Sequence, residues 1–360
     1  MAGRVTIQDI ADSLGVSRNT VSKAINNTGV IAESTKKLIL QKAVEMGYRN
    51  HSGVGRTYGP GHVKQDSGVD VSKKEIAMLT SSMPGGSHFA VTTLDRMQQI
   101  FSSNGYSLTY YRITKEELES LNLPGTLNLN ATAAMFCMEL FHYDYCRMLA
   151  DTGVPLLLID GPALFDKEPL PADMLIMENC ASIHYFVRML AQKGKRSVGF
   201  IGNILHCQSF FERWGACATA ASVNGFPSAE KYSVLHYSPG TDSGRSISYR
   251  DSSDDLFDKL EKLPELPDAF ICANDFIAIT LISALRRMNL RCPEDILVLG
   301  FDDSPESRFH SPSLSTVHIH TQAMGRLAAE LILGRIADPG RDFRGTYSMT
   351  ELILRESSEI

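Results

Sequence analysis

The stretch Val5–Asn26, VTIQDIADSLGVSRNTVSKAIN, decides how the whole chain is interpreted. Thr6 is a candidate helix N-cap, and Asp9 three residues later completes a capping box. Gly15 readily adopts the left-handed conformation that ends a helix, and Ser17 can cap the next helix. The stretch therefore predicts two short helices joined by a glycine-containing turn, which is the helix-turn-helix motif.

Each predicted helix has an apolar side and a polar side. The apolar residues at helical spacing are Ile7, Ile10, Ala11 and Leu14 in the first helix, over about 7–13, and Val21, Ala24 and Ile25 in the second. The polar side of the second helix carries side chains that can hydrogen-bond base edges or phosphates in a major groove. The candidate DNA contacts are Thr6, Ser17, Arg18, Asn19, Thr20, Ser22, Lys23 and Asn26. A small helical bundle with a solvated polar face is the alternative interpretation.

A third helix is expected from about Glu33 to Met46, because apolar residues recur there at helical spacing. Its expected inner face is Leu38, Ile39, Ala43 and Val44, and Gly47 and Tyr48 are expected to close it. Together the three helices can enclose a small core.

Four short segments of this region resemble the headpiece of the LacI/GalR family of bacterial transcriptional regulators. They are Val5–Ile7, Asp9–Ala11, Gly15–Ser17 and Thr20–Ser22. Agreement of several spaced motifs is more specific than a single match. The resemblance implies that residues 1–50 form a DNA-binding headpiece, and that an effector-binding core follows.

The charge of the chain is distributed unevenly. The formal net charge is −6, but residues 1–50 hold seven basic against four acidic residues, which gives +3. The remaining residues hold 28 basic against 37 acidic ones, which gives −9. A basic headpiece attracts the DNA backbone, and an acidic body is repelled by it.

The 360 residues, 43% of them hydrophobic, suffice for a small headpiece and one or two ordinary domains. No apolar stretch reaches the ~20 residues of a membrane span, and the first residues carry helix signals where a secretory leader would be apolar. We therefore expect a cytoplasmic protein without a membrane partner. The cysteines are expected to be reduced core residues; they are Cys137, Cys146, Cys180, Cys207, Cys217, Cys272 and Cys292.

Residues 51–74 are rich in glycine and are expected to form a flexible linker. By resemblance, family members carry here a hinge helix of the Ala-Arg-x-Leu type, whose leucine enters the minor groove. In this chain residues 51–57 read HSGVGRT. Glycine costs about 1 kcal/mol per helical position relative to alanine, which opposes such a helix. We expect the wedge to be absent, unless Val54, Tyr58 or another residue replaces it.

From Glu75 onward, apolar runs alternate with helical patterns, which predicts parallel strands with helices on both faces of each sheet. The first series has strands at 76–80, 108–111, 133–138 and 156–160 and helices near 89–103 and 143–151. The second begins near Leu175 and has strands at 197–202, 232–237, 269–273 and 296–301 and helices near 181–192, 213–222, 256–263 and 276–288.

The body resembles the family's two-lobe, periplasmic-binding-protein-like core of type I. The segments that carry this resemblance are 267–270, 273–275, 292–296, 300–303, 315–317, 324–328 and 352–357. The resemblance implies an effector and dimerisation core at 75–360, in which the chain crosses between lobes three times. The N-lobe is then about 75–177 and 319–345, and the C-lobe about 178–318 and 346–360. The predicted fold is an all-α helix-turn-helix headpiece followed by a two-lobe α/β core with parallel sheets.

Ligands of open parallel sheets bind beyond the carboxyl ends of the strands. The candidate effector contacts are therefore residues that follow strands: Ser81, His88, Phe89, Glu178, Arg213, Trp214, Asn274 and Asp302. By resemblance, Arg213 clamps the effector, and Asn274 and Asp302 hydrogen-bond its hydroxyls. A guanidinium, an amide and a carboxylate form a set suited to a polyol.

Several of these candidates have a structural alternative. His88 and Phe89 can stack on a ligand ring, or cap a helix and fill the core. Glu178 and its neighbour Asn179 can accept ligand hydroxyls or cap the following helix. Trp214 can stack on a sugar, or fill the space where the family has a Gly-aromatic pair and this chain has Ala216-Cys217.

No motif of an enzyme is present: the chain lacks a Gly-x-Ser-x-Gly elbow, a His-Glu-x-x-His pair and a Walker loop. His318 and His320 share a strand face, but two ligands without a third make a poor metal site. We expect no catalytic residues, no metal and no cofactor.

The sequence thus predicts a homodimeric transcriptional repressor that binds double-stranded operator DNA and responds to a small-molecule effector, a sugar. Two alternatives remain open. The effector can be another metabolite, such as a nucleobase or a phosphorylated compound. From a different class, a solute-binding protein shares the two lobes but has no headpiece. The effector, the operator and the sense of the response do not follow from the sequence.

Overall fold

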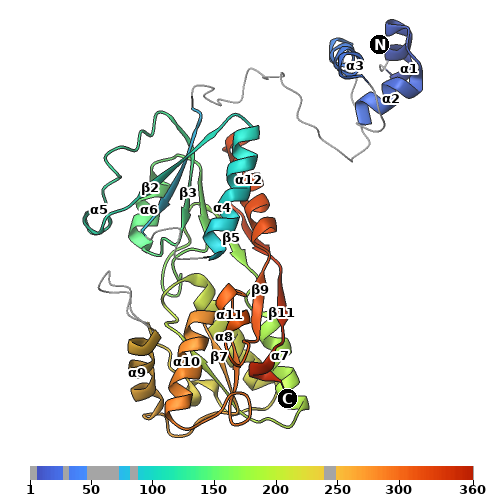
Figure 1. Ribbon diagram of the computed structural model, residues 1–360. Coiled ribbons are helices and arrows are strands. Elements are labelled where there is room, and N and C mark those ends of the chain that lie inside the picture. Colours follow the sequence, from blue (N-terminus) through green and yellow to red (C-terminus); the bar gives the residue numbers. More distant parts are fainter. Residues whose placement is uncertain (1–5, 27–31, 47–72, 82–87, 239–248, 360) are drawn as a thin grey trace. The chain divides into compact units, whose positions relative to one another are not determined.

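The computed structural model describes residues 6–26, 32–46, 73–81, 88–238 and 249–359 (Figure 1). The chain divides into two compact units, Met1–Asp66 and Ser67–Ile360. The first contains the helical headpiece and the second the α/β body, as predicted. Most of the linker predicted at 51–74 lies outside the described residues.

Within its described residues, the headpiece has three helices: α1 (Ile7–Leu14), α2 (Arg18–Asn26) and α3 (Glu33–Glu45). Gly15 follows α1 with φ 64°, in the left-handed conformation that the sequence predicts. The buried core consists of Ile10, Ala11, Val21, Ala24, Ile39 and Ala43, with Ile7 and Leu14 packed against it. The motif predicted from the sequence is therefore confirmed.

The prediction that Leu38 lies on the inner face of α3 is wrong. Leu38 is 54% exposed, whereas Ile39 is fully buried. Successive residues of a helix point about 100° apart, so only part of the apolar run at 38–40 can face the core. Two of the predicted residues, Gly47 and Tyr48, lie outside the described residues. The side chains of Ile25 and Val44 lie outside the described side chains.

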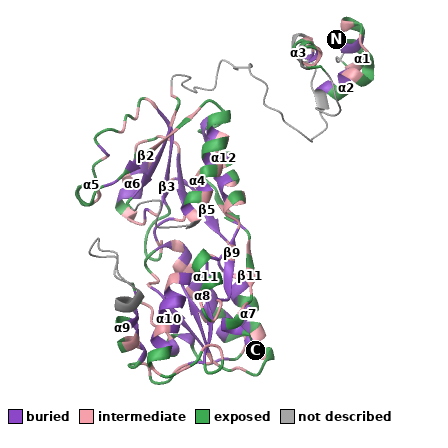
Figure 2. Cartoon of the chain, in the orientation of Figure 1, coloured by how far each residue is buried: buried purple, intermediate pink, exposed green. Residues whose placement is uncertain are grey.

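A six-stranded parallel sheet forms the N-lobe, with the strand order β10-β5-β4-β3-β1-β2. The strands are β1 (Glu75–Thr80), β2 (Ser107–Arg112), β3 (Thr132–Met138), β4 (Leu156–Ile159), β5 (Asp173–Met177) and β10 (Gly345–Ser348). The helices of this lobe are α4 (His88–Ser103), α5 (Lys115–Ser120), α6 (Tyr143–Asp151) and α12 (Thr321–Ala337). Alternate residues of β1 enter different cores: Ile76 and Met78 on one face, Ala77 and Leu79 on the other. Both faces are buried, as a parallel sheet requires (Figure 2).

A three-stranded parallel sheet, β6-β7-β8, forms the C-lobe. Its strands are β6 (Val198–Ile201), β7 (Ala269–Cys272) and β8 (Leu297–Leu299). Its helices are α7 (Ala181–Gln192), α8 (Gln208–Val223), α9 (Tyr249–Leu260), α10 (Asp275–Arg287) and α11 (Pro305–Phe309), with short 3-10 turns at Ala229–Tyr232 and Glu356–Ser358. The predicted alternation of strands and helices is confirmed in both lobes.

The strand predicted at 232–237 is wrong: only isolated bridges form there, from Val234 to Ile201 and from His236 to Asn203. Tyr232 belongs to a 3-10 turn. The amide of Phe200 donates to the hydroxyl of Ser233 at 2.8 Å, so a side chain occupies a position that a ladder bond would fill.

The chain passes between the lobes three times: between β5 and α7, between β9 (Thr316–Ile319) and α12, and between β10 and β11 (Thr350–Ile353). β9 and β11 form an antiparallel pair that runs along this junction (Figure 1). Since β10 pairs with β5, the N-lobe sheet continues to Ser348, slightly beyond the expected boundary.

All seven cysteines are free thiols; five are buried and two are half-buried. Among the described helices, none combines the length and the apolar character needed to span a bilayer.

Candidate functional site

The hydroxyls predicted to contact DNA at the two helix starts make local hydrogen bonds. The Thr6 hydroxyl accepts from the amide of Asp9 at 3.3 Å, and the amide of Thr6 donates to the Asp9 carboxylate at 2.7 Å. This is the capping box that the sequence predicts. At α2, the Ser17 hydroxyl accepts from the amide of Thr20 at 3.1 Å and lies 2.8 Å from its hydroxyl. These bonds fix the start of α2.

Three longer polar side chains of α2 are exposed: Arg18, Asn19 and Lys23. Val21 and Ala24, on the same helix, are buried in the headpiece core. Ser22 is half-buried and has a bonding partner, and the side chain of Asn26 lies outside the described ones. The helix therefore presents one guanidinium, one amide and one ammonium beside an anchored apolar face.

In the body, Arg213 is the centre of the candidate site. It lies on α8, is almost fully buried, and stacks its guanidinium 3.4 Å from the ring centroid of Phe301. Its Nε donates to Asn179 Oδ1 at 2.9 Å, and its Nη1 donates to the carbonyl of Ala273 at 2.6 Å. Nη1 also lies 3.9 Å from Asp302 Oδ1. These bonds hold the guanidinium where the carboxyl ends of β7 and β8 meet.

Asp302 follows β8 in an unusual backbone conformation, with φ 113°. Burial raises the pKa of its carboxyl to about 8, although Arg213 opposes this shift. The negative charges of Asp275, Asp160 and Glu139 add to it. The side chain is still 35% exposed, so a ligand can reach it.

Asp160 faces this group from the other lobe. It follows β4 with φ 48°, and its carboxylate accepts from the amide of Ser209, at the start of α8, at 3.2 Å. Burial raises the pKa of Asp160, and Arg213 and Ser209 oppose this only in part. The amide of Gln208 also donates to the carbonyl of Gly161 at 2.9 Å, so the two lobes are hydrogen-bonded here.

A continuous polar network links these groups. The amide nitrogen of Asn179 donates to the Ser209 hydroxyl at 3.3 Å and to Glu212 at 2.8 Å, while its oxygen accepts from Arg213. We call this set the junction cluster; it consists of Asp160, Asn179, Ser209, Glu212, Arg213 and Asp302. It joins the two lobes at the carboxyl ends of their strands.

Of the eight predicted effector residues, two belong to the junction cluster, Arg213 and Asp302. Asn274 caps α10, because its side-chain oxygen accepts from the amide of Ile277 at 3.0 Å. Glu178 binds the amides of Cys180 and Ala181 and so caps α7. Capping is the structural alternative stated for Glu178, and Asn274 makes the same kind of contact.

The other predicted residues lie outside the cluster. Ser81 is exposed, and its hydroxyl donates to the carbonyl of Glu139 at 3.2 Å. Phe89 packs against the N-lobe core, and His88 begins α4 with a side chain outside the described ones. Trp214 packs against the C-lobe core, with its ring centroid 5.9 Å from that of Phe200. This contact is the packing alternative stated for Trp214.

Sequence reasoning did not include Asp160 among the candidates, and it considered Asn179 only as the neighbour of Glu178. Both follow strands, β4 and β5, so the rule applied to Asp302 also applies to them. Within α8 a further signal was available: adjacent residues point about 100° apart, so Arg213 and Trp214 face different surroundings.

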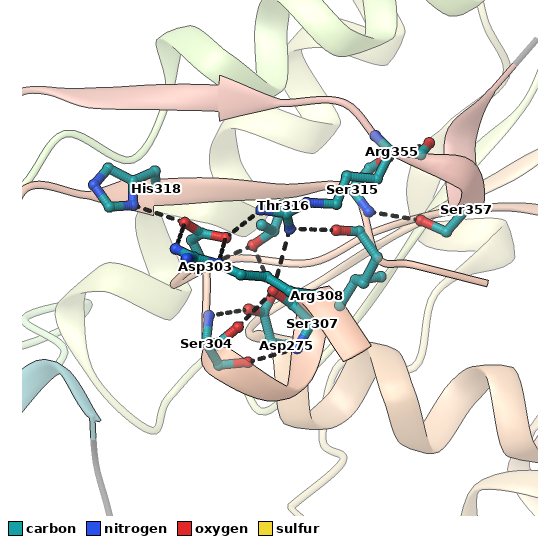
Figure 3. A network of polar contacts seen from close by, with 11 residues as sticks. Asp275, Asp303, Ser304, Ser307, Arg308, Ser315, Thr316, His318, Arg355 and Ser357 are labelled. Atoms are coloured by element: carbon teal, nitrogen blue, oxygen red, sulfur yellow. Dashed lines mark hydrogen bonds and ion pairs between the residues drawn. The ribbon is translucent and has the colours of Figure 1, made fainter. Parts of the chain in front are cut away.

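A second polar network holds the crossing strand β9 (Figure 3). Asp303 accepts from Arg308 at 2.7 Å, from Arg355 at 2.6 Å and from His318 at 2.9 Å. Burial alone would raise the pKa of Asp303, but these partners outweigh it and hold the pKa below its usual value. The network therefore fixes β9 to the loop after β8.

Asp275 lies beneath this network and is almost fully buried. It accepts from the Thr316 hydroxyl at 2.6 Å and from the amide of Ser304 at 2.8 Å. Burial raises its pKa to about 6. His318 and His320 have ring centroids 4.8 Å apart. No group of three metal-ligating side chains occurs within the part of the chain that the structure describes.

Comparison with known proteins accounts for both units. The model of the lacI family of bacterial regulatory proteins matches residues 6–50, and that of the periplasmic binding protein-like domain matches residues 187–358. The chain is 27% identical over 356 residues to the HTH-type transcriptional repressor PurR of Pasteurella multocida (strain Pm70), with 98% of each chain covered. It is 26% identical over 363 residues to the probable HTH-type transcriptional repressor ExuR of Bacillus subtilis (strain 168), again with 98% of each covered.

Solved structures show the same fold. A complex of the transcriptional regulator CelR with cellobiose aligns with a TM-score of 0.67 at 22% identity, over 99% of this chain and 100% of that chain. The lac repressor dimer bound to operator and the anti-inducer ONPF aligns with a TM-score of 0.63 at 18% identity, over 99% of both chains. Since the headpiece and the core are both matched, the chain belongs to the lacI family of bacterial regulatory proteins, as a DNA-binding transcriptional regulator with an effector-binding core.

Proposed function

We propose that this regulator is a homodimeric repressor whose hold on operator DNA is set by a sugar bound at the junction cluster. The exposed Arg18, Asn19 and Lys23 of α2 supply the groups that contact base edges and phosphates in a major groove. A second subunit would present the same helix to the other half of a pseudo-palindromic operator. Such a protein works in the cytoplasm, beside the chromosome, and the proposal includes no catalytic step.

One observation carries the effector site: the buried Arg213 guanidinium is held by Asn179 beside Asp302, which is 35% exposed. Arg213 Nη2 has no hydrogen-bond partner among the described residues, which leaves a donor for a ligand oxygen. A guanidinium donor and carboxyl oxygens together bind vicinal hydroxyls. The cellobiose in the complex of CelR supports a sugar as the ligand class.

The same site can couple ligand to DNA. Asp160 belongs to the N-lobe and Asp302 to the C-lobe, so a ligand that contacts both favours one arrangement of the lobes over others. A ligand shifts such an equilibrium by its difference in affinity for the two arrangements, and by linkage the affinity for DNA changes.

The test combines two measurements on the full chain. A thermal-shift screen against sugars, sugar phosphates and nucleobases identifies the effector class, since a ligand at a hundred times its Kd adds about 2.7 kcal/mol of stability. Gel-shift titration with operator DNA, with and without the stabilising compound, then shows whether that compound changes DNA affinity. A nucleobase or phosphorylated hit in place of a sugar would establish the alternative effector class.

Two altered chains separate the parts of the proposal. A chain without residues 1–50 is expected to keep ligand stabilisation and lose DNA affinity. Arg213→Ala is expected to lose ligand stabilisation while it still binds operator. A compound that stabilises Arg213→Ala as strongly as the parent protein would refute the assignment of the site.

A further inference from the structure

The junction cluster holds more carboxyls than cations. Asp160 comes from the N-lobe, and Glu212 and Asp302 come from the C-lobe. Arg213 is the one basic side chain of the cluster, and its single charge cannot neutralise both Asp160 and Glu212, even while Asp302 holds a proton. The charge balance therefore disfavours any ligand that brings a further negative charge.

The guanidinium is also largely engaged within the protein. Two of its nitrogens donate to Asn179 and to the carbonyl of Ala273, and its face covers Phe301. An incoming carboxylate or phosphate would need a fork of two free donors for its strongest binding mode. Arg213 no longer offers that fork, although Nη2 can still donate to a neutral hydroxyl.

The carboxyls themselves are crowded and accessible. The Asp302 side chain is 35% exposed, and Asp160 and Glu212 are half-buried. Burial, with the charges of Asp275 and Asp160, raises the pKa of Asp302 to about 8, and the opposing effect of Arg213 does not offset this. A positive group placed between the lobes would be stabilised by the same carboxyls.

Aromatic rings border the cluster. The Phe210 ring centroid lies 5.7 Å from the Arg213 guanidinium carbon. The His206 ring lies 5.1 Å from that of Phe210 and 4.8 Å from that of Phe141, which comes from the other lobe. Such rings pack against the apolar face of a ring compound.

We infer that the junction cluster selects a hydroxylated ring compound that carries a protonated amino group, such as an amino sugar, over its uncharged and anionic analogues. The inference rests on the proposed function and narrows its ligand class. The positive charge of the ammonium group favours the ionised form of Asp302, so Asp302 gives up its proton when the ligand binds. The ammonium group then donates to the carboxylates of Asp160 and Asp302. The ring hydroxyls bond with Arg213 and with Glu212, and the ring packs against Phe210.

The experiment titrates the full chain by calorimetry at neutral pH with matched triads of probes. These are glucosamine, glucose and glucuronate; galactosamine, galactose and galacturonate; and mannosamine, mannose and mannuronate. In at least one triad, the amino sugar is expected to bind at least about tenfold more tightly than the neutral sugar, because charged hydrogen bonds are the stronger ones. The acid of that triad is expected to show no binding.

Two variants locate the preference. In Asp302→Asn the ratio of amino to neutral affinity is expected to fall towards one, because the charge is lost and the shape is kept. Asp258→Asn removes an exposed carboxyl on α9 and is the matched control, which should keep the parent ratio.

The inference is overturned if, in every triad that binds, the neutral or the acidic sugar binds at least as tightly as its amino partner. The absence of binding by all three amino sugars, or an unchanged ratio in Asp302→Asn, also overturns it. Operator binding is measured separately by gel shift. A chain that binds operator and responds to a neutral sugar refutes only this inference, whereas a chain without operator binding refutes the proposed function.

Discussion

Arg18 and Asn19 are exposed side chains at the start of α2, whose position is fixed by the Ser17 cap. Arginine hydrogen-bonds guanine and asparagine hydrogen-bonds adenine, so truncation removes information about sequence as well as affinity. Arg18→Ala or Asn19→Ala is expected to reduce discrimination between operator and random DNA by ~1–3 kcal/mol.

Gel-shift titration of both DNAs measures this discrimination. Lys193→Ala, an exposed change on the body, is the control and should bind both DNAs like the parent protein. If the α2 variants weakened operator and random DNA equally, α2 would contact only the backbone.

Asp302 gives a prediction about pH. Its pKa is raised from an ordinary value near 3.8 to about 8, so between these values the folded protein holds a proton that the unfolded chain has released. The contribution of this group to stability therefore falls as pH rises through that window. Asparagine cannot ionise and escapes this loss.

Melting temperatures of Asp302→Asn and the parent protein, measured across the window from about 4 to about 8, test the sign. The difference in favour of the variant is expected to grow with pH and then level off. A difference that is constant, or that shrinks as pH rises, would show that the Asp302 carboxyl is not held protonated in the fold.

At the scale of elements, the prediction from sequence worked where one signal was sufficient. The cap at Thr6 and the left-handed Gly15 follow from local chemistry, and α7 has the bounds expected from its spacing. The prediction that Leu38 is buried failed because its neighbour Ile39 is equally apolar. The packing of α3 against α1 and α2 determines which of the two is buried. The strand predicted at 232–237 does not form, because the Ser233 hydroxyl takes the place of a hydrogen bond of the strand ladder.

The candidate site was predictable only in part. The strand-end rule and the family resemblance select Arg213 and Asp302, but the rule does not tell which strand ends face each other across two lobes. Asp160 and Asn179 also satisfy the strand-end rule, but their place beside Arg213 depends on how the lobes pair, which no local pattern contains.

Gly15 yields a prediction for the headpiece. A Cβ at this position would meet nothing within 4 Å, so the effect of a side chain comes from its φ of 64° alone. Gly15→Ala is expected to destabilise the headpiece by about 1 kcal/mol and to weaken operator binding. For operator binding by the full chain, Gly125→Ala is the control, because its site also has no neighbours within 4 Å but has a φ outside the left-handed range.

Thermal unfolding of residues 1–66 with and without Gly15→Ala measures the first effect, and gel shift on the full chain measures the second. Unchanged headpiece stability would mean that the turn accommodates an alanine without strain.

For the whole molecule, the segment that connects headpiece and core departs most from the family resemblance. Val54 to Thr57 offer no leucine wedge, and glycines oppose a helix there. Wedges of this kind kink DNA and make the centre of a site part of its recognition. We expect a less bent operator, weaker preference at its central base pairs and greater tolerance of half-site spacing.

Bending assays, footprinting and operators with altered spacers measure these properties. An Ala-Arg-Ala-Leu segment in place of Val54 to Thr57 is expected to tighten binding and to restore central preference. A sharp central kink with the unaltered protein, or loss of binding when the spacer changes by a single base pair, would contradict the expectation.

The crossing strand β9 is anchored unevenly, and this has a mechanical consequence. On the C-lobe side, Thr316 and His318 are bound to Asp275 and Asp303, whereas α12 starts at Thr321 and packs on α4 of the N-lobe. A strand that is fixed at one end bends most easily just beyond its last fixed residue. We therefore expect the motion of one lobe relative to the other to occur mainly at residues 319–321. Because α12 follows these residues, a small rotation there moves the far end of α12 by a larger distance. On effector binding, the rate of hydrogen exchange should change at the amides of residues 319–321 and stay constant at 315–318. The reverse pattern would show that the hinge between the lobes lies elsewhere.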